Sequence, residues 1–344
     1  MKFDIIITTY NRPDSVLNLV QQINECTILP QSIIVVDSSD VRNLEVSQTQ
    51  RVSYIHSSHK NQPYQRYLGF IASKEDIVVF MDDDVSITNK DIFKIHLDSI
   101  TKDNVVGSTV RYTQEGLTNA QSEVGNLRQV NSFGAIIYFL WWLTGTPRIK
   151  DGRVWLAGLR GADNNNVYTE SFGGPGTLCF KREIVTFLFD DLIFSLYEKK
   201  MGKGEDKYIS MGAIKHGKLC YNNIPCLQHP PNESSYFQDL TSFYRRELFS
   251  RLLLSRRYLT VKGKWIGWGY IHYYWFAFWR ILIAGIHCLL HPREGNFQIF
   301  KGKLLGVIDT VKNPFKAEYL CPDINWADQF AKDLKTLKVQ NHRK

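Results

Sequence analysis

One stretch of the sequence decides the fold: Val78-Val79-Phe80-Met81-Asp82-Asp83-Asp84-Val85, in which three carboxylates follow an apolar run. The apolar run is typical of a buried strand, so the three acids follow the end of that strand. Adjacent carboxylates repel one another, and a divalent cation is the usual compensation. Hard oxygen ligands suit Mg²⁺ or Mn²⁺, and the bound ion can then hold a diphosphate. A solvated acidic turn remains the alternative for this stretch taken alone.

The N-terminal segments end in polar residues in the same way. Residues 3–7 predict a buried strand that breaks into the polar loop 8–13, and an amphipathic helix is expected from Pro13 to about Cys26. A second buried strand at 33–36 ends at Asp37. Strand, helix and strand in this order predict the start of a parallel α/β sheet.

Ligands of such a sheet bind outside the carboxyl ends of its strands. We therefore expect Thr8, Asp37 and Asp84 to meet in one crevice. Each of them alone is also typical of a helix cap or a turn. That alternative is weakened because the three residues follow successive strands.

Further segments continue the pattern. The sequence predicts strands at 52–56 and 104–108 and helices at about 62–73 and 91–99. The apolar insert 134–143 is too short to span a bilayer, and a core helix and an interfacial loop are both open for it.

Two motifs in the second half carry further chemistry. Residues 171–182 form a glycine-rich loop that enters a strand, where glycines permit close backbone approach to a ligand or simply make a turn. The loop lacks the lysine-serine signature of a phosphate-binding P-loop. Residues 202–208 place Glu205 and Asp206 at an expected helix start. A carboxylate there can act as a general base in a cleft, or can merely favour the helix start.

In combination these segments resemble glycosyltransferase family 2, inverting nucleotide-sugar transferases with a GT-A fold. The resemblance covers residues 2–229. It implies an α/β protein with a Rossmann-like, mostly parallel sheet flanked by helices. The catalytic domain would be 1–232, with a nucleotide-binding half 1–110 and an acceptor half 111–232, and 233–344 would be a helical C-terminal extension.

The resemblance also implies a role for each matching residue. It assigns nucleotide-sugar binding to Thr8, Tyr10, Asn11, Arg12, Asp37, Arg66, Asp82 and Asp83. Next to Arg66, Tyr67 departs from the asparagine common in the family. It assigns acceptor binding to Gly173, Gly174 and Glu205. Asp206 would be the general base, and Asp84 and His229 would hold Mn²⁺ or Mg²⁺. A lone histidine is more often an ordinary polar residue, but neutral imidazole suits manganese.

Composition agrees with a catalytic domain plus an extension. The chain has 344 residues, of which 44% are hydrophobic, enough to bury a substantial core. Its six cysteines show neither a CxxC pair nor zinc spacing, so reduced thiols in a cytoplasmic protein are expected. The first strand starts almost at once, so we expect no signal peptide.

The extension is basic and aromatic. Residues 243–258 predict a basic amphipathic helix, and residues 265–290 are long enough for a transmembrane helix but contain Arg280. A charge near a bilayer centre costs at least ~2.5 kcal/mol. The net charge of +8 and the aromatic residues favour an in-plane helix on the cytoplasmic face of the membrane. A helical subdomain packed on the core and a true span are the alternatives.

These observations together predict a metal-dependent inverting glycosyltransferase, peripheral to the membrane, in bacterial surface polysaccharide assembly. The expected donor is linked to UDP or dTDP, and the acceptor is a glycan or a lipid-linked sugar; an oligomer is left open. The aromatic residues cluster with aliphatic ones instead of alternating with lysines, which argues against nucleic-acid binding. The alternative is a catalytically inactive GT-A-like binding or scaffold protein.

Overall fold

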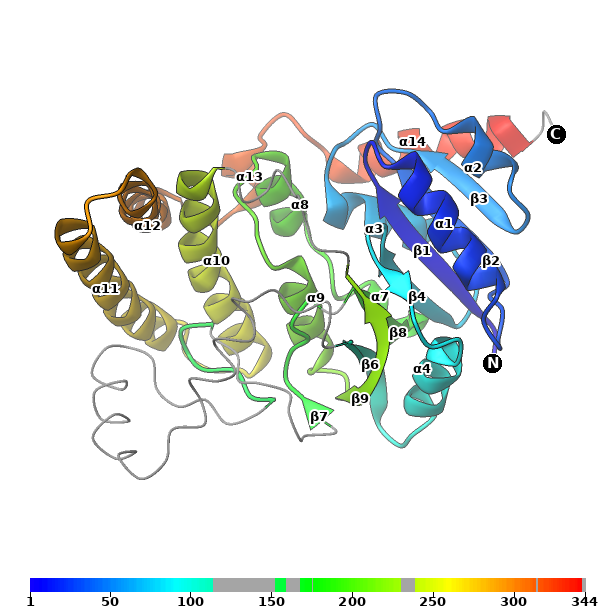
Figure 1. Ribbon diagram of the computed structural model, residues 1–344, viewed down its shortest axis with the longest axis horizontal. Coiled ribbons are helices and arrows are strands. Elements are labelled where there is room, and N and C mark those ends of the chain that lie inside the picture. The colour runs from blue at the N-terminus through cyan, green and yellow to red at the C-terminus, as the bar shows by residue number, and fades with distance from the viewer. Residues whose placement is uncertain (114–151, 159–167, 175, 230–238, 314, 342–344) are drawn as a thin grey trace.

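The computed structural model describes residues 1–113, 152–158, 168–174, 176–229, 239–313 and 315–341. Within these residues the chain forms one nine-stranded sheet with helices on its faces and a helical C-terminal region (Figure 1). The strand order is β3-β2-β1-β4-β8-β6-β9-β5, and β7 pairs with β9. The apolar insert 134–143 lies outside the described residues.

The first half of the sheet is parallel. Its elements are β1 (Phe3–Thr9), α1 (Pro13–Asn24), β2 (Ser32–Asp37), α2 (Leu44–Gln48), β3 (Val52–His56), α3 (Gln62–Ala72) and β4 (Ile77–Asp82). β1 lies between β2 and β4, and β3 follows β2, all in parallel register. Pro13 occupies the first turn of α1, where its missing N–H has no helical partner to lose. The apolar stripe of α1 then covers one face of the sheet, as the sequence predicts.

The second half of the sheet is mixed. Its elements are β5 (Ser86–Ile87), α4 (Ile92–Ile100), β6 (Val105–Tyr112), β7 (Tyr168–Thr169), β8 (Thr177–Lys181), α7 (Arg182–Val185), α8 (Asp191–Glu198), α9 (Glu205–Ala213) and β9 (Lys218–Gln228). β8 runs antiparallel to both β4 and β6, whereas β6 and β9 are parallel. The expected parallel pairing therefore holds from β3 to β4 and again between β6 and β9, whereas β5, β7 and β8 pair antiparallel with their neighbours. A short, fully buried strand carries no pattern that reveals its direction, so the sequence could not distinguish the two.

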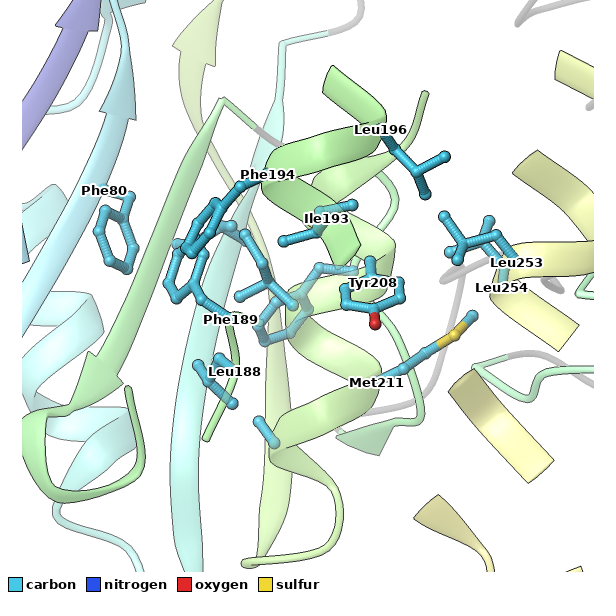
Figure 2. Close-up of a cluster of buried hydrophobic side chains, with 14 of the residues drawn as sticks. Phe80, Leu188, Phe189, Ile193, Phe194, Leu196, Tyr208, Met211, Leu253 and Leu254 are labelled. Carbon is cyan, nitrogen blue, oxygen red and sulfur yellow. The ribbon is translucent and has the colours of Figure 1, made fainter. Parts of the chain in front are cut away.

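A hydrophobic cluster joins the sheet to the helices of its second half. It runs from Phe80 on β4 through Phe189 and Phe194 to Leu253 and Leu254 on α10 (Leu240–Val261), as Figure 2 shows. The rings of Phe80 and Phe189 lie 6.0 Å apart, in an edge-on arrangement. Helix α10 therefore shares one hydrophobic core with the sheet.

Three long helices form the first part of the C-terminal extension. They are α10, α11 (Gly267–Leu290) and α12 (Glu294–Lys312). Gly302 and Gly306 let α12 approach α10, since a Cβ at either glycine would lie 2.5 Å from a backbone oxygen of α10. Figure 1 shows α11 and α12 on the side of α10 away from the sheet.

The last part of the extension returns to the parallel half of the sheet. After α13 (Ala317–Leu320), helix α14 (Trp326–Asn341) packs against α3 and β3. The ring of Phe330 stacks on that of Tyr64 at 4.3 Å, and the Trp326 indole donates a hydrogen bond to Ser195 Oγ at 3.0 Å. The membrane association expected for 233–344 stays a prediction; the apolar side chains of this last part belong to the same hydrophobic core as the sheet.

The cysteines are unpaired, as predicted. All six are free, and every one except Cys288 is buried. They pack as small apolar side chains.

Asp333 anchors α14 to α3 and the loop before it, and its removal should destabilise the protein. Its buried carboxylate accepts hydrogen bonds from the Ser58 backbone N–H, the Ser58 hydroxyl and the Tyr64 hydroxyl, each at 3.0 Å. Asp333→Ala leaves these donors without their partner, so we expect the free energy of unfolding to fall by about 2–4 kcal/mol. Denaturant titration measures this change. Asp328→Ala, at an exposed position of the same helix, is the control and should change it by at most about 0.5 kcal/mol. Equal effects of the two changes would contradict the anchoring role.

Candidate active site

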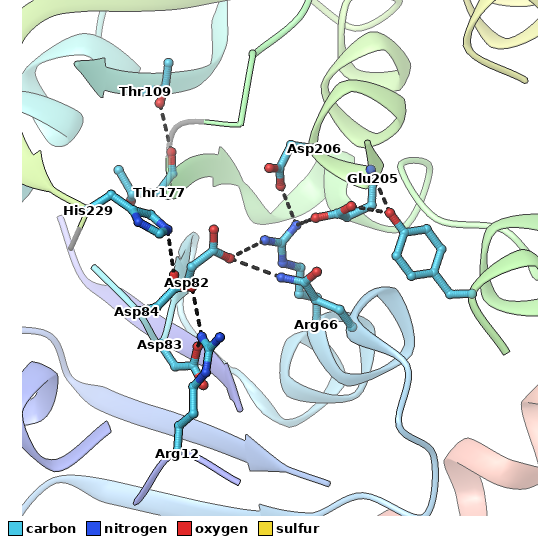
Figure 3. Close-up of polar contacts among 12 residues, drawn as sticks. Arg12, Arg66, Asp82, Asp83, Asp84, Thr109, Thr177, Glu205, Asp206 and His229 are labelled. Carbon is cyan, nitrogen blue, oxygen red and sulfur yellow. Dashed lines mark hydrogen bonds and ion pairs between the residues drawn. The ribbon is translucent and has the colours of Figure 1, made fainter. Parts of the chain in front are cut away.

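The three adjacent carboxylates at the end of β4 bind two arginines, Arg66 and Arg12 (Figure 3). Asp82 ends β4 and binds Arg66, with 2.7 Å between Oδ1 and Nη2. Asp83 accepts hydrogen bonds from the Thr9 hydroxyl at 2.7 Å and from Arg12 Nη1 at 3.0 Å. Asp84 binds the same Arg12 nitrogen at 2.8 Å. Each acid of the motif therefore has its own position in the site.

Arg66 connects this motif to the Glu205-Asp206 motif. Its side chain is almost fully buried, and Nη1 binds Asp206 Oδ1 at 2.5 Å while Nη2 binds Asp82. Glu205 Oε1 lies 3.7 Å from Nη1. The sequence suggested that Arg66 contacts the nucleotide. The structure places it between the carboxylates of two motifs that lie 120 or more residues apart, and the nucleotide contact stays a prediction.

Burial and mutual repulsion alter the acidity of these groups. Burial raises the pKa of Asp82, Glu205 and Asp206 above their ordinary values, and the positive charge of Arg66 opposes that rise. Burial also lowers the pKa of Arg66, but the charges of Asp206 and Asp82 outweigh it and the net shift is upward. A carboxylate whose pKa is raised is a stronger base at neutral pH.

Asp206 combines a fixed oxygen with an available one. Oδ1 is held by Arg66, whereas Oδ2 makes no hydrogen bond to any residue in the described part of the chain. Oδ2 faces the glycine-rich loop, since a Cβ at Gly174 would lie 3.7 Å from it. The structure thus brings the predicted acceptor loop to the predicted base.

Local geometry holds the start of α9 in place. Gly204 precedes the helix with a φ of +81°, a left-handed conformation that disfavours other residues. The Tyr197 hydroxyl donates to the Glu205 carboxylate and accepts the Glu205 backbone N–H at 3.1 Å. Glu205 is therefore fixed by Tyr197 beside Arg66.

A separate pocket lies beside Asp37, with a volume of about 480 Å³. Asp37 is buried at the end of β2, where Oδ1 accepts the Ser39 backbone N–H at 2.7 Å and the Ser39 hydroxyl. Its Oδ2 accepts the Tyr54 hydroxyl at 2.5 Å. The pocket also borders the loop from Thr9 to Pro13, which leads from β1 into α1. Its size suits a nucleobase next to the carboxylate motif.

The predicted binding residues in and beside the β1–α1 loop differ in their partners and in their burial. Arg12 reaches Asp83 and Asp84, and Asn11 donates its backbone N–H to Ser39 at 2.7 Å. Tyr10 is exposed and its hydroxyl accepts a hydrogen bond from Lys60 at 3.1 Å. Thr8 is buried, and its hydroxyl has no hydrogen-bond partner among the described residues. Thr9, the neighbour that the sequence did not suggest, binds the motif instead.

His229 and Asp84 could share one metal ion. His229 follows β9, and its Nε2 lies 3.4 Å from Asp84 Oδ1. Mg²⁺ bonds to its ligands at about 2.0–2.1 Å and commonly uses one or two protein groups plus substrate phosphates, so this separation suits two ligands of one ion. Within the described residues no group of three or more acids, histidines or cysteines gathers as a metal site. A metal would therefore need further ligands from water or a bound substrate.

The charge balance of the cleft also suits a cation. Five carboxylates face two guanidinium groups in the network of Figure 3, those of Arg12 and Arg66. Burial raises the pKa of Asp83 despite its hydrogen bond from Thr9. A divalent cation would lower the repulsion that remains. The residues present thus fit a Mg²⁺ or Mn²⁺ ion.

Four residues of the site were not suggested by the sequence. Thr9 and Tyr54 bind the predicted acids, and Tyr197 holds Glu205. Tyr112 lies edge-on to His229, with ring centroids 6.1 Å apart. Tyr54 could have been found from the register of β2 and β3. It pairs with Val35, and Asp37 lies two residues further along β2, on the same face of the sheet. The tyrosines at 112 and 197 carry no local motif.

Comparison with known proteins agrees with the fold and the motifs. Residues 4–154 match the sequence profile described as Glycosyl transferase family 2. No curated protein sequence matches the chain significantly.

Solved structures resemble the whole chain. TarS of S. aureus, residues 1–349, matches 100% of this chain and 92% of its own, with 13% identity and a TM-score of 0.53. Its complex with UDP-GlcNAc gives 15% identity and a TM-score of 0.54, with the same coverage. The mannosyltransferase PcManGT of Pyrobaculum calidifontis, in complex with GDP-Man and Mn²⁺, covers 90% of this chain and 87% of its own, at 11% identity and a TM-score of 0.50. At these identities the likeness shows the fold alone.

The described sheet and helices, including the helical C-terminal region, are thus those of a GT-A protein. Residues 4–154 match glycosyltransferase family 2, the family that the motifs of the sequence resemble.

Proposed function

We propose that the protein is a metal-dependent, inverting glycosyltransferase that moves a sugar from a nucleotide diphosphate to a hydroxyl group of a glycan or a lipid-linked acceptor. One observation carries this proposal. Buried Arg66 holds Asp206 and Asp82 together, so a candidate base and a candidate diphosphate site belong to one rigid network.

The donor would lie along the carboxyl ends of β2, β1 and β4. Its base fits the pocket beside Asp37, and its ribose and diphosphate extend past Arg12 toward Asp83 and Asp84. The expected nucleotide is UDP or dTDP. TarS binds UDP-GlcNAc and PcManGT binds GDP-Man, which supports a nucleotide-sugar donor for this fold.

Asp206 would remove the proton of the acceptor hydroxyl during its attack on the anomeric carbon. Oδ2 is available for this proton because Arg66 holds only Oδ1. The raised pKa of Asp206, caused by burial, favours proton transfer near neutral pH. Attack from the face opposite the leaving diphosphate inverts the anomeric configuration, and no covalent enzyme intermediate is needed.

Asp84 and His229 would hold the metal ion, which supplies positive charge for the leaving diphosphate. Arg12 would contribute further positive charge beside the same phosphates, because its guanidinium already lies against Asp83 and Asp84. Glu205, fixed by Tyr197, would orient the acceptor.

The exposed face of the C-terminal helices supports a function at a membrane surface. Along α11 a buried stripe including Tyr273, Phe276 and Ala277 packs on the protein, whereas Trp268, Ile271 and further large apolar residues are exposed. The exposed large apolar residues of α11 and α12 are Trp268, Ile271, Trp275, Phe278, Leu282, Ile283, Ile286, Leu289, Leu290, Phe297, Leu304, Ile308 and Val311. Such a patch with aromatic residues suits the lipid interface.

By length and composition α11 is the one helix of the described chain that could cross a bilayer, and 22% of its most apolar window is buried. Its packed face favours an in-plane position, since a span would draw the flanking helices α10 and α12 into the bilayer with it. We propose that the protein is peripheral on the cytoplasmic face of a bacterial membrane and acts in surface polysaccharide assembly.

Loss of the proposed metal ligands should remove the effect of Mn²⁺ on the affinity for the nucleotide. Calorimetric titration of UDP into Asp84→Ala is expected to show no gain in affinity on adding Mn²⁺, because a metal ligand is gone. His229→Ala should still gain affinity for UDP on adding Mn²⁺, but less than the parent protein does. Asp98→Asn, an exposed change on α4, should behave as the parent protein does. A full manganese effect in Asp84→Ala would contradict the metal site.

Removal of the base should slow the reaction without abolishing donor binding. Asp206→Asn keeps the shape of the side chain and loses its basicity, so we expect hydrolysis of the UDP-sugar in the presence of Mn²⁺ to fall by roughly 10²–10⁴-fold. Affinity for UDP should stay near that of the parent. Asp103→Asn, at an exposed position, is the control. Near-normal turnover would direct attention to Glu205, and absence of turnover in the parent protein would favour the inactive scaffold.

Polar substitutions on the exposed face of α11 should weaken membrane binding. We expect the triple variant Ile271→Ser, Trp275→Ser and Phe278→Ser to sediment less with phosphatidylglycerol vesicles than the parent protein. Ile224→Ser, an exposed apolar residue of β9, should have no effect. High salt or alkaline carbonate should extract the parent protein, because salt screens its basic contacts. Extraction by detergent alone would show that α11 spans the bilayer.

A further inference from the structure

Tyr112 carries a hydroxyl group to which the proposed reaction gives no role. Tyr112 ends β6, and its half-buried ring packs on the hydrophobic cluster that includes Val85 and Leu227. The hydroxyl makes no hydrogen bond to any residue in the described part of the chain. Phenylalanine would fill the same space, so packing alone does not account for the hydroxyl. A polar group removed from bulk water needs a partner, and a bound ligand can supply one.

Gly176 fixes where this hydroxyl lies. The glycine-rich loop enters β8 at Gly176, whose φ is +69°. A Cβ at Gly176 would collide with the Tyr112 hydroxyl and would lie 2.7 Å from Val85 Cγ1. The Gly176 carbonyl accepts the backbone N–H of Asp82 at 3.0 Å. The hydroxyl therefore lies where the glycine-rich loop meets the carboxylate motif.

One side of Tyr112 faces the proposed metal ligands. Its ring lies edge-on to that of His229, with ring centroids 6.1 Å apart. The strands explain this contact, because Tyr112 pairs with Leu227 in the register of β6 and β9 and His229 follows two residues later. His229 Nε2 in turn lies 3.4 Å from Asp84 Oδ1. Tyr112 is thus a direct neighbour of the place proposed for the metal ion.

The other side of Tyr112 leads to the proposed base. Gly174 comes two residues before Gly176 in the same loop, so their Cα atoms lie within about 7 Å of each other. A Cβ at Gly174 would lie 3.7 Å from Asp206 Oδ2. The loop therefore leads from the base to the Tyr112 hydroxyl. Burial raises the pKa of Tyr112, and the negative charges of both carboxylate motifs raise it further, in agreement with this position.

The donor sugar of the proposed reaction has to lie in the same interval. Its anomeric carbon is bonded to the diphosphate, which the metal ion at Asp84 and His229 would hold. The acceptor hydroxyl attacks the same carbon while Asp206 takes its proton. Figure 3 shows Asp206 and His229 on opposite sides of Asp82, so the sugar ring would lie between them. The Tyr112 hydroxyl faces this place.

We propose that Tyr112 Oη donates a hydrogen bond to a hydroxyl group of the donor sugar and so helps to select that sugar. This inference rests on the proposed function, because it takes Asp206 as the base and Asp84 as a metal ligand. A tyrosine hydroxyl keeps its proton at neutral pH and can therefore donate. A site that binds a substrate hydroxyl in this way discriminates against a sugar that lacks it, because the polar group of the protein then stays unpaired.

The change Tyr112→Phe removes the hydroxyl and keeps the ring beside His229. Affinity is measured by calorimetric titration of the full-length protein with Mn²⁺ present, and the probes are UDP-glucose, UDP-galactose, UDP-N-acetylglucosamine, dTDP-rhamnose, UDP and dTDP. For the nucleotide sugar that binds the parent protein most tightly, we expect the affinity to fall roughly 2- to 10-fold, the effect of one hydrogen bond. Affinity for the matching nucleoside diphosphate should not change. Tyr319→Phe, at an exposed position of α13, is the control and should change neither affinity.

Mono-deoxy analogues of that nucleotide sugar test for direct contact. Removal of the sugar hydroxyl that Tyr112 binds should lower the affinity of the parent protein. The same analogue should bind Tyr112→Phe as tightly as the complete sugar does, since the hydrogen bond is already lost in this variant. A purely structural role of Tyr112 would not couple the two changes.

Three results would overturn the sugar contact. The first is equal affinity of the parent protein and Tyr112→Phe for the nucleotide sugar. The second is an equal fall in affinity for the nucleotide sugar and for its nucleoside diphosphate, which would assign the hydroxyl to the diphosphate or the metal. The third is that every deoxy analogue lowers the affinity of both proteins to the same extent.

The parent protein keeps the two proposals apart. Its failure to bind any of these nucleotides would contradict the glycosyltransferase function and, with it, the sugar contact. Nucleotide binding by the parent protein together with one of the three results would contradict the role of Tyr112 alone.

Discussion

The buried guanidinium of Arg66 is the interaction on which the site depends. It joins Asp82, at the end of the parallel half of the sheet, to Asp206, at the start of α9. A buried charge without a partner costs several kcal/mol, so neither carboxylate can move away without leaving Arg66 uncompensated. The same contact keeps both acids close to a cation while burial raises their pKa. Arg66 therefore sets both the position and the basicity of the candidate base.

The cleft between β4 and α9 carries an excess of negative charge. Five carboxylates face the guanidinium groups of Arg12 and Arg66 there. This excess suits a divalent cation, which would in turn hold a diphosphate.

The C-terminal extension has two structural roles. Helices α11 and α12 expose a broad apolar face, whereas α14 lies against α3 and β3, where Asp333, Trp326 and Phe330 are buried. The chain thus passes from the core around the sheet to the exposed helices and back again (Figure 1). Anchoring at both ends holds α11 in a defined orientation to the site.

The sequence by itself determined the local elements and the identity of the acids. Apolar runs that end in Asp37 and Asp82 predicted β2 and β4, and the Glu205-Asp206 pair predicted the start of α9, because strand burial and helix starts leave short-range patterns. Only the tertiary structure decided the rest. The direction of β8, the bridging position of Arg66 and the return of α14 all join residues distant in sequence, and long-range packing leaves no periodic signal. The hydrogen bond between Tyr64 and Asp333, 269 residues apart, is the clearest case.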